Sequence, residues 1–135
     1  MNILEKFGTD DDLETGTGVT LDFGSGCTVT VHRAGGSNKR YHKALAKALK
    51  PYRQQVQADN LDMNEAIEAF AEVYVETVII AWTGVEDNDG PVDIKDKKRS
   101  VALLVAAPDF FEIIKTEAEA RATFQDEEKT ADAGN

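Results

Sequence analysis

The chain has 135 residues, of which 41% are hydrophobic and 30% charged, an ordinary composition for one globular domain. Its formal net charge of −10 argues against nucleic-acid or anionic-membrane binding by the whole surface. The only cysteine, Cys27, excludes an internal disulfide. We expect neither a signal peptide nor a membrane span, because no apolar run approaches the roughly 18 residues that a span needs. A cytoplasmic location is therefore expected.

The first part of the chain is expected to contain an arm and a small hairpin. Residues 1–16 are polar and acidic, and we expect a flexible arm there. Over 17–33, two short runs alternate apolar and polar residues around Gly24-Ser25-Gly26. This pattern is typical of a β-hairpin.

Helical spacing dominates the middle of the chain. A first helix is expected after Ser37 or Asn38, with Pro51 kinking or ending it. A second, longer helix is expected from Asn60 or Asp62 to about Trp82, with its second half buried nearly all round.

Two shorter helices are expected in the last part of the chain, Lys97–Ala107 and about Asp109 to Gln125, separated by Pro108. Residues 126–135 are expected to form an acidic flexible tail. The predicted fold class is therefore mainly α: one helical domain of about four helices over 17–125, with a small N-terminal β-hairpin.

Charge is segregated along the chain. Residues 23–58 contain seven basic residues and no acid, whereas both flanking segments are acidic. Such a basic block could bind a phosphate backbone. We favour the other interpretation, in which the first helix pairs with acidic faces of the same chain or of a neighbouring copy.

Catalytic and metal sites are weighed and set aside. Cys27 with His32 or His42 could activate a thiolate, but Cys27 fits a packed strand position. Aligning Gly90 with the glycine of an EF-hand loop places Val85, which has no side-chain oxygen, at the first ligand position. The acidic segment that ends at Gly90 is explained more simply as a turn. We predict no enzyme activity, no cofactor and no metal.

The region from Glu76 to Phe124 resembles the tail assembly chaperones of long-tailed bacteriophages. Its parts are Val78–Val85 with Trp82, the turn from Asp87 to Pro91, Ser100–Leu104, and Pro108-Asp109-Phe110. The upstream segment with Arg33, Asn38, Tyr41 and Lys50-Pro51-Tyr52 is also similar to longer members of that family.

The resemblance implies a non-catalytic protein that binds the phage tape measure protein and helps to recruit tail tube subunits. Contact with tail tube protein would involve a longer, frameshifted form, and the protein would stay in the host cytoplasm and be absent from the mature virion. We also expect self-association. A virion structural protein of the tail or head–tail connector is the alternative, and a small nucleic-acid-binding regulator is the third possibility. The candidate protein-contact residues are Tyr41, Lys43, Lys47, Lys50, Trp82, Val85, Phe110 and Phe111.

Overall fold

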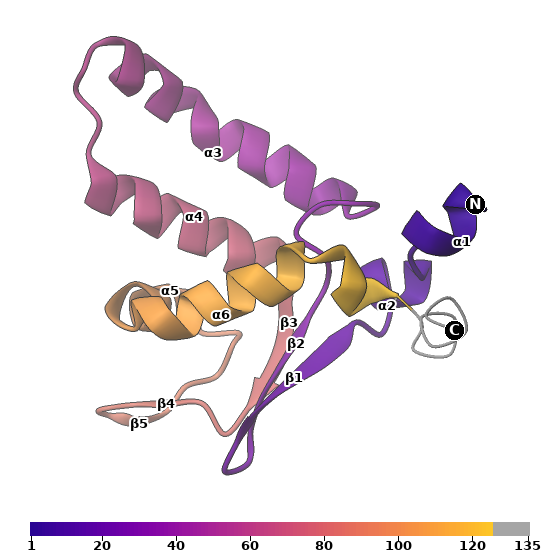
Figure 1. Ribbon diagram of the computed structural model, residues 1–135. Coiled ribbons are helices and arrows are strands. Elements are labelled where there is room, and N and C mark those ends of the chain that lie inside the picture. Colours follow the sequence, from indigo (N-terminus) through magenta and orange to yellow (C-terminus); the bar gives the residue numbers. More distant parts are fainter. Residues whose placement is uncertain (126–135) are drawn as a thin grey trace.

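A three-stranded antiparallel sheet carries the helices of the protein. In the computed structural model, which describes residues 1–125, β1 (Val19–Gly24), β2 (Cys27–Val31) and β3 (Ile79–Thr83) lie in the order β1-β2-β3 (Figure 1). Gly24-Ser25-Gly26 connects β1 and β2 with positive φ at all three residues, a conformation that glycine adopts without a steric penalty. β2 is the central strand and pairs with β1 on one side and β3 on the other.

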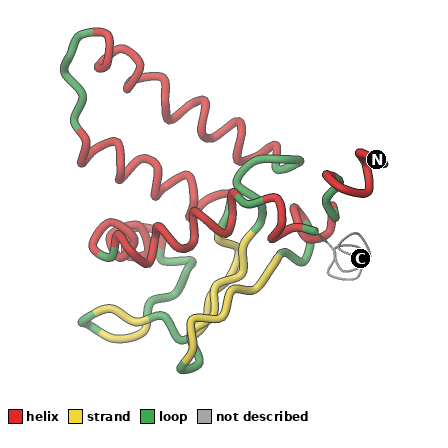
Figure 2. Tube along the Cα trace, in the orientation of Figure 1, coloured by secondary structure: helices red, strands yellow, loops and turns green. Residues whose placement is uncertain are grey.

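The mainly α fold class predicted from the sequence is wrong, because the protein has an α+β fold. β1 and β2 do not form a small hairpin attached to a helical domain, since β3 completes their sheet. A second ladder joins β4 (Glu86–Asp87) to β5 (Gly90–Pro91). Figure 2 shows the strands gathered on one side of the helices.

β3 occupies part of the segment that was expected to be the end of a long helix. Consecutive Val78, Ile79 and Ile80 include β-branched side chains that favour strands. The unpaired edge of β2 supplies hydrogen-bond partners that local spacing cannot reveal, and Val29 lies opposite Trp82. Tertiary pairing therefore overrides the helical pattern.

Two helices form an antiparallel pair that projects from the body (Figure 1). α3 (Lys39–Gln57) begins at Asn38, whose side chain accepts a hydrogen bond from the Tyr41 amide, and it continues past Pro51. α4 (Met63–Thr77) begins at Asp62, which accepts from two backbone amides of its first turn. Both starts follow the expected capping chemistry.

The last helices pack against α4 and close the core. α5 (Lys97–Ala106) is followed by α6 (Pro108–Glu119) and the 3₁₀ turn η1 (Arg121–Phe124). Tyr74 of α4 is fully buried. The remaining large, fully buried side chains of the described core include Leu104, Ile114, Phe124, Val29 and Val31.

The N-terminal segment contains two short helices where a flexible arm was expected, α1 (Ile3–Phe7) and α2 (Asp11–Thr15). Buried Glu14 of α2 forms an ion pair with Arg33 at 2.8 Å, which attaches α2 to the body. α1 has no buried residue. The expected acidic tail, 126–135, lies outside the described residues. Among the helices of residues 1–125, none combines the length and apolar content needed to span a bilayer.

Candidate functional site

An apolar groove lies between α3 and α4 and reaches α6. Its volume is about 690 Å³, within the range of small-molecule and peptide pockets. Phe70 and Phe111 lie at its inner end, with ring centroids 6.2 Å apart. Apart from Tyr52, Arg53, Gln57 and Lys115, the residues that line it are apolar.

Large apolar side chains are exposed along this groove. Leu49 is 38% exposed, Val56 60%, Leu61 41%, Met63 59% and Ile67 42%. All five line the groove. A contiguous patch of this kind marks a protein or ligand contact surface more often than isolated exposed residues do.

Polar atoms border the groove without filling it. The Tyr52 hydroxyl donates to the Glu65 carbonyl oxygen at 3.1 Å and joins the two helices. The Lys115 ammonium lies 4.7 Å from the centroid of the Phe111 ring and 5.7 Å from that of Phe70. These two cation–π contacts place a positive charge at the inner end of the groove.

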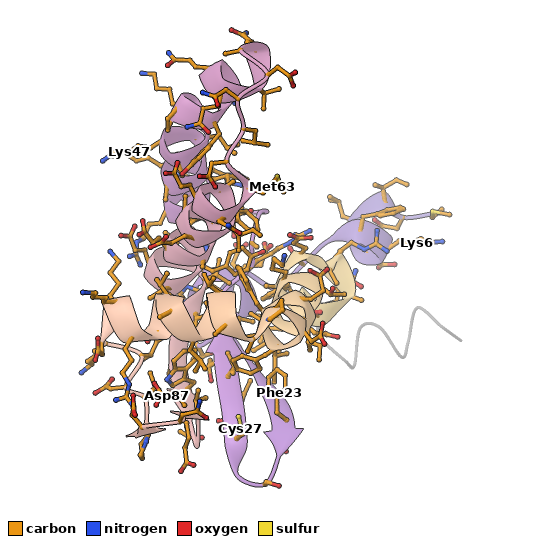
Figure 3. The ribbon with its side chains drawn as sticks, turned by 90° about the vertical axis from the view of Figure 1, so that its left-hand side faces the viewer. Lys6, Phe23, Cys27, Lys47, Met63 and Asp87 are labelled. Atoms are coloured by element: carbon orange, nitrogen blue, oxygen red, sulfur yellow. The ribbon has the colours of Figure 1, made fainter. Side chains whose placement is uncertain are left out.

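The helical repeat explains how α3 presents two different surfaces. Residues two apart on a helix lie about 200° apart around its axis. Leu45 and Leu49 therefore point to one side of α3, and Lys43 and Lys47 point to the other. Figure 3 shows Lys47 and Met63 extending from opposite sides of the helical pair. The second side forms a separate cleft with Lys43 and Lys47 in its lining.

The residues proposed from the sequence as protein contacts occupy three kinds of position. Tyr41, Trp82 and Val85 are in the core, with exposed fractions of 6%, 8% and 6%. Phe111 is buried at the inner end of the groove, and Phe110 packs edge-on against Phe23 with centroids 5.0 Å apart. The remaining three, Lys43, Lys47 and Lys50, are exposed on α3.

Arg99 holds together the acidic turn from Asp87 to Pro91. Arg99 donates to both carboxylate oxygens of Asp87, from Nε at 2.8 Å and Nη2 at 2.7 Å. These hydrogen bonds lower the pKa of Asp87 to about 2. Within residues 1–125, no group of three His, Cys, Asp or Glu side chains is placed to hold a metal ion.

The histidines and the cysteine lie in separate places. His32 Nε2 is 2.8 Å from the Gly16 carbonyl oxygen, and His42 Nε2 is 3.0 Å from that of Gly36. Burial is the main cause that raises the pKa of the Cys27 thiol, and Asp22 adds to it. A raised pKa disfavours the reactive thiolate.

Sequence reasoning missed most of the groove. The candidate contact residues taken from the sequence include none of its five exposed apolar side chains, Leu49, Val56, Leu61, Met63 and Ile67. One available signal was the continuation of apolar spacing in α3 beyond Pro51, to Val56. Apolar residues on both sides of a helix–helix connection then mark the open end of the pair.

One comparison with known proteins relates the chain to a family. The family described as YdaY prophage protein matches residues 36–135. That range includes α3 to α6 and hence the whole groove, and it leaves out α1, α2, β1 and β2. No curated protein matches significantly, and no solved structure does.

Proposed function

The chain belongs to the family of YdaY prophage proteins, and from that premise we propose that it is a non-catalytic phage tail assembly chaperone. In this proposal the α3–α4 groove binds an amphipathic helix of the tape measure protein. The single observation that carries the proposal is the continuous row of exposed apolar side chains along the groove.

The groove suits a helical client. Helix-in-groove recognition places apolar residues at three- and four-residue spacing into a hydrophobic channel between helices. Val56 and Met63 lie near the open end, and Phe70 and Phe111 lie at the inner end. A client helix with one apolar stripe could therefore bury the full length of the exposed row.

The charge of the chain supports a chaperone of apolar clients. A net charge of −10 opposes nonspecific association, so an apolar groove can stay accessible without precipitation. The proposed protein works in the host cytoplasm and is absent from the mature virion. Recruitment of tail tube protein through a longer, frameshifted form belongs to the same proposal.

Co-expression with the tape measure protein of the same prophage tests the groove directly. The wild-type chain should raise the soluble yield of that protein and co-purify with it. Val56→Glu/Met63→Glu should abolish both effects without unfolding the chaperone, since both side chains are about 60% exposed. Val105→Glu/Ile113→Glu is the matched control, because these residues are also exposed but do not line the groove.

Three outcomes are informative. The proposal would be contradicted if both double variants lost co-purification and soluble yield of the tape measure protein equally. It would also be contradicted if the wild-type chain did not raise that yield. Mass spectrometry of particles from the induced prophage then separates a chaperone from a structural subunit of the tail or connector. Stoichiometric amounts of the chain in those particles would replace the chaperone proposal with a structural one.

A further inference from the structure

A positively charged cleft lies on the other side of α3. Its volume is about 780 Å³. Arg40, Lys43 and Lys47 contribute to it from α3, Lys95 from the segment before α5, and Lys97 from the first position of α5. The fold thus brings together cations that are about fifty residues apart in the sequence.

The cations of α3 form no ion pairs with carboxylates of the described residues. Its six basic side chains form no ion pair within 4.0 Å with any carboxylate of residues 1–125. Glu76 is the one carboxylate in the cleft lining, and it pairs with Lys97. Arg40 donates to the Glu76 carbonyl oxygen at 2.9 Å, which neutralises no charge. Pairing within the described chain therefore does not account for this surface.

The cleft also has apolar side chains between its charges. Val75, Ile79, Ile80 and Ile94 line it, and Ile80 is 38% exposed. A phosphate backbone would match the cations but would leave this apolar surface uncovered. The surface is complementary to a segment that carries both acidic and apolar side chains.

The N-terminal segment of the same chain has that chemistry. Met1, Ile3, Leu4 and Phe7 are between 46% and 87% exposed, and α1 contributes no residue to the core. Residues 1–12 contain four acids and one lysine. Those acids form no ion pair within the described residues. The segment therefore has exposed apolar surface and unpaired negative charge together.

The base of this segment is fixed while its apolar side chains face outward. Gln125 Nε2 donates to the carbonyl oxygens of Lys6 and Gly8 at 2.9 and 3.1 Å. The Arg121 guanidinium lies 4.6 Å from the centroid of the Phe7 ring. Figure 1 shows α1 projecting at the opposite side of the molecule from the tip of the α3–α4 pair. An anchored, projecting segment can enter a neighbouring molecule with little loss of conformational entropy.

We propose that the cleft binds the N-terminal segment of a second copy, with Glu5 and Asp11 facing the lysines of α3. The proposal rests on charge complementarity and on matching apolar surface. It does not depend on the identity of the client in the α3–α4 groove.

Charge reversal on each side tests the proposal in the full chain. Lys43→Glu/Lys47→Glu reverses the cleft, and Glu5→Lys/Asp11→Lys reverses the segment without touching its helix caps, Asn2 and Asp10. Sedimentation velocity at low salt should show self-association of the wild-type chain. Each double variant should weaken it at least about tenfold. High salt should weaken it as well.

A mixture gives the decisive measurement. Each reversed variant should be monomeric alone, and the two mixed should associate, because the basic segment of one matches the acidic cleft of the other. Lys39→Glu/Lys50→Glu is the matched control, since it makes the same charge change on α3 outside the cleft lining and should keep self-association. Circular dichroism verifies that each variant is folded.

Several results would overturn the proposal. One is a wild-type chain that stays monomeric at low salt. Another is a control variant whose self-association weakens as much as that of the cleft variant. The third is a mixture of the two folded, charge-reversed variants that does not associate. Loss of duplex DNA binding in the cleft variant with unchanged self-association would assign the cleft to nucleic acid instead. Failure of the tape measure co-expression leaves all these outcomes unaffected, so the two proposals fail separately.

Discussion

The burial of Trp82 gives the sharpest test of the β2–β3 pairing. Its side chain is 8% exposed, and its indole Nε1 donates to the Val92 carbonyl oxygen at 2.9 Å. Trp82→Ala removes the ring and should lower the free energy of unfolding by about 3–5 kcal/mol. Trp82→Phe keeps an aromatic ring but leaves the Val92 carbonyl without its donor, and this should cost about 1–3 kcal/mol. The two variants should therefore rank in that order.

The assay is urea unfolding followed by far-ultraviolet circular dichroism. Trp82 is the only tryptophan, so its fluorescence follows chains that keep it but not the two Trp82 variants. Its emission should shift to longer wavelength on unfolding. Val105→Ala, at a 39% exposed position on α5, is the control and should change stability by less than about 1 kcal/mol. If the free energy of unfolding falls with urea concentration at the same slope in all variants, they unfold from comparable structures.

One result would refute this reasoning. If Trp82→Ala remains folded and costs less than about 1 kcal/mol, the indole does not lie in the core. A native emission maximum equal to that of the unfolded chain would agree with that result. The register that places Trp82 opposite Val29 would then be wrong.

Three further predictions follow from single contacts. Burial raises the pKa of Glu14, but hydrogen bonds, chiefly from Arg33, outweigh burial and hold that pKa below 4.5. The stability that ionised Glu14 contributes is therefore present above pH 4.5 and is lost as pH falls through the lowered pKa. Glu14→Gln should cost about 1–3 kcal/mol at neutral pH and flatten that acid dependence in urea titrations. Gly84→Ala should lower the melting temperature, because φ is +66° and the new Cβ would clash with the Gly26 carbonyl oxygen. Calcium should leave the melting temperature unchanged, because Arg99 occupies both carboxylate oxygens of Asp87.

Each of these predictions has a control or a contrary outcome. Gly24→Ala has a similar positive φ but no atom within 4 Å of the new Cβ, so a smaller effect there isolates the steric contact at Gly84. An acid dependence that is identical in wild type and Glu14→Gln would contradict the assignment of the ion pair. A calcium-dependent rise in melting temperature that Asp87→Asn removes would restore the metal-site interpretation.

The helix starts were the most predictable part of the fold. Asn38, Asp62 and Asp96 each accept a hydrogen bond from a backbone amide of the helix that follows, and Pro108 begins α6. Capping depends on two to four neighbouring residues, so the sequence contains the information directly. The end of α4 at Thr77 depends instead on β2, whose distance in sequence makes the pairing invisible to local patterns.

The groove was less predictable because helical periodicity identifies an apolar face but not its partner. Leu45 is partly buried against the core, whereas Val56, on the same face of α3, is 60% exposed. α3 runs past the body that covers its first half. Only the relative lengths and directions of α3 and α4 determine where that covered surface ends.

The two surfaces of α3 have a consequence for assembly. Because the apolar groove and the cationic cleft lie on opposite sides of one helix, the two proposed partners, a client helix and the N-terminal segment of a second copy, would not compete for one surface. A chain of copies linked segment to cleft would then present its grooves as a series of separate sites. A long helical client offers repeated apolar stripes, and linked grooves would bind it with an effective concentration that single copies lack. Glu5→Lys/Asp11→Lys should therefore weaken binding of a long client much more than binding of a single short helix. Equal weakening of both would indicate that self-association does not contribute to client binding.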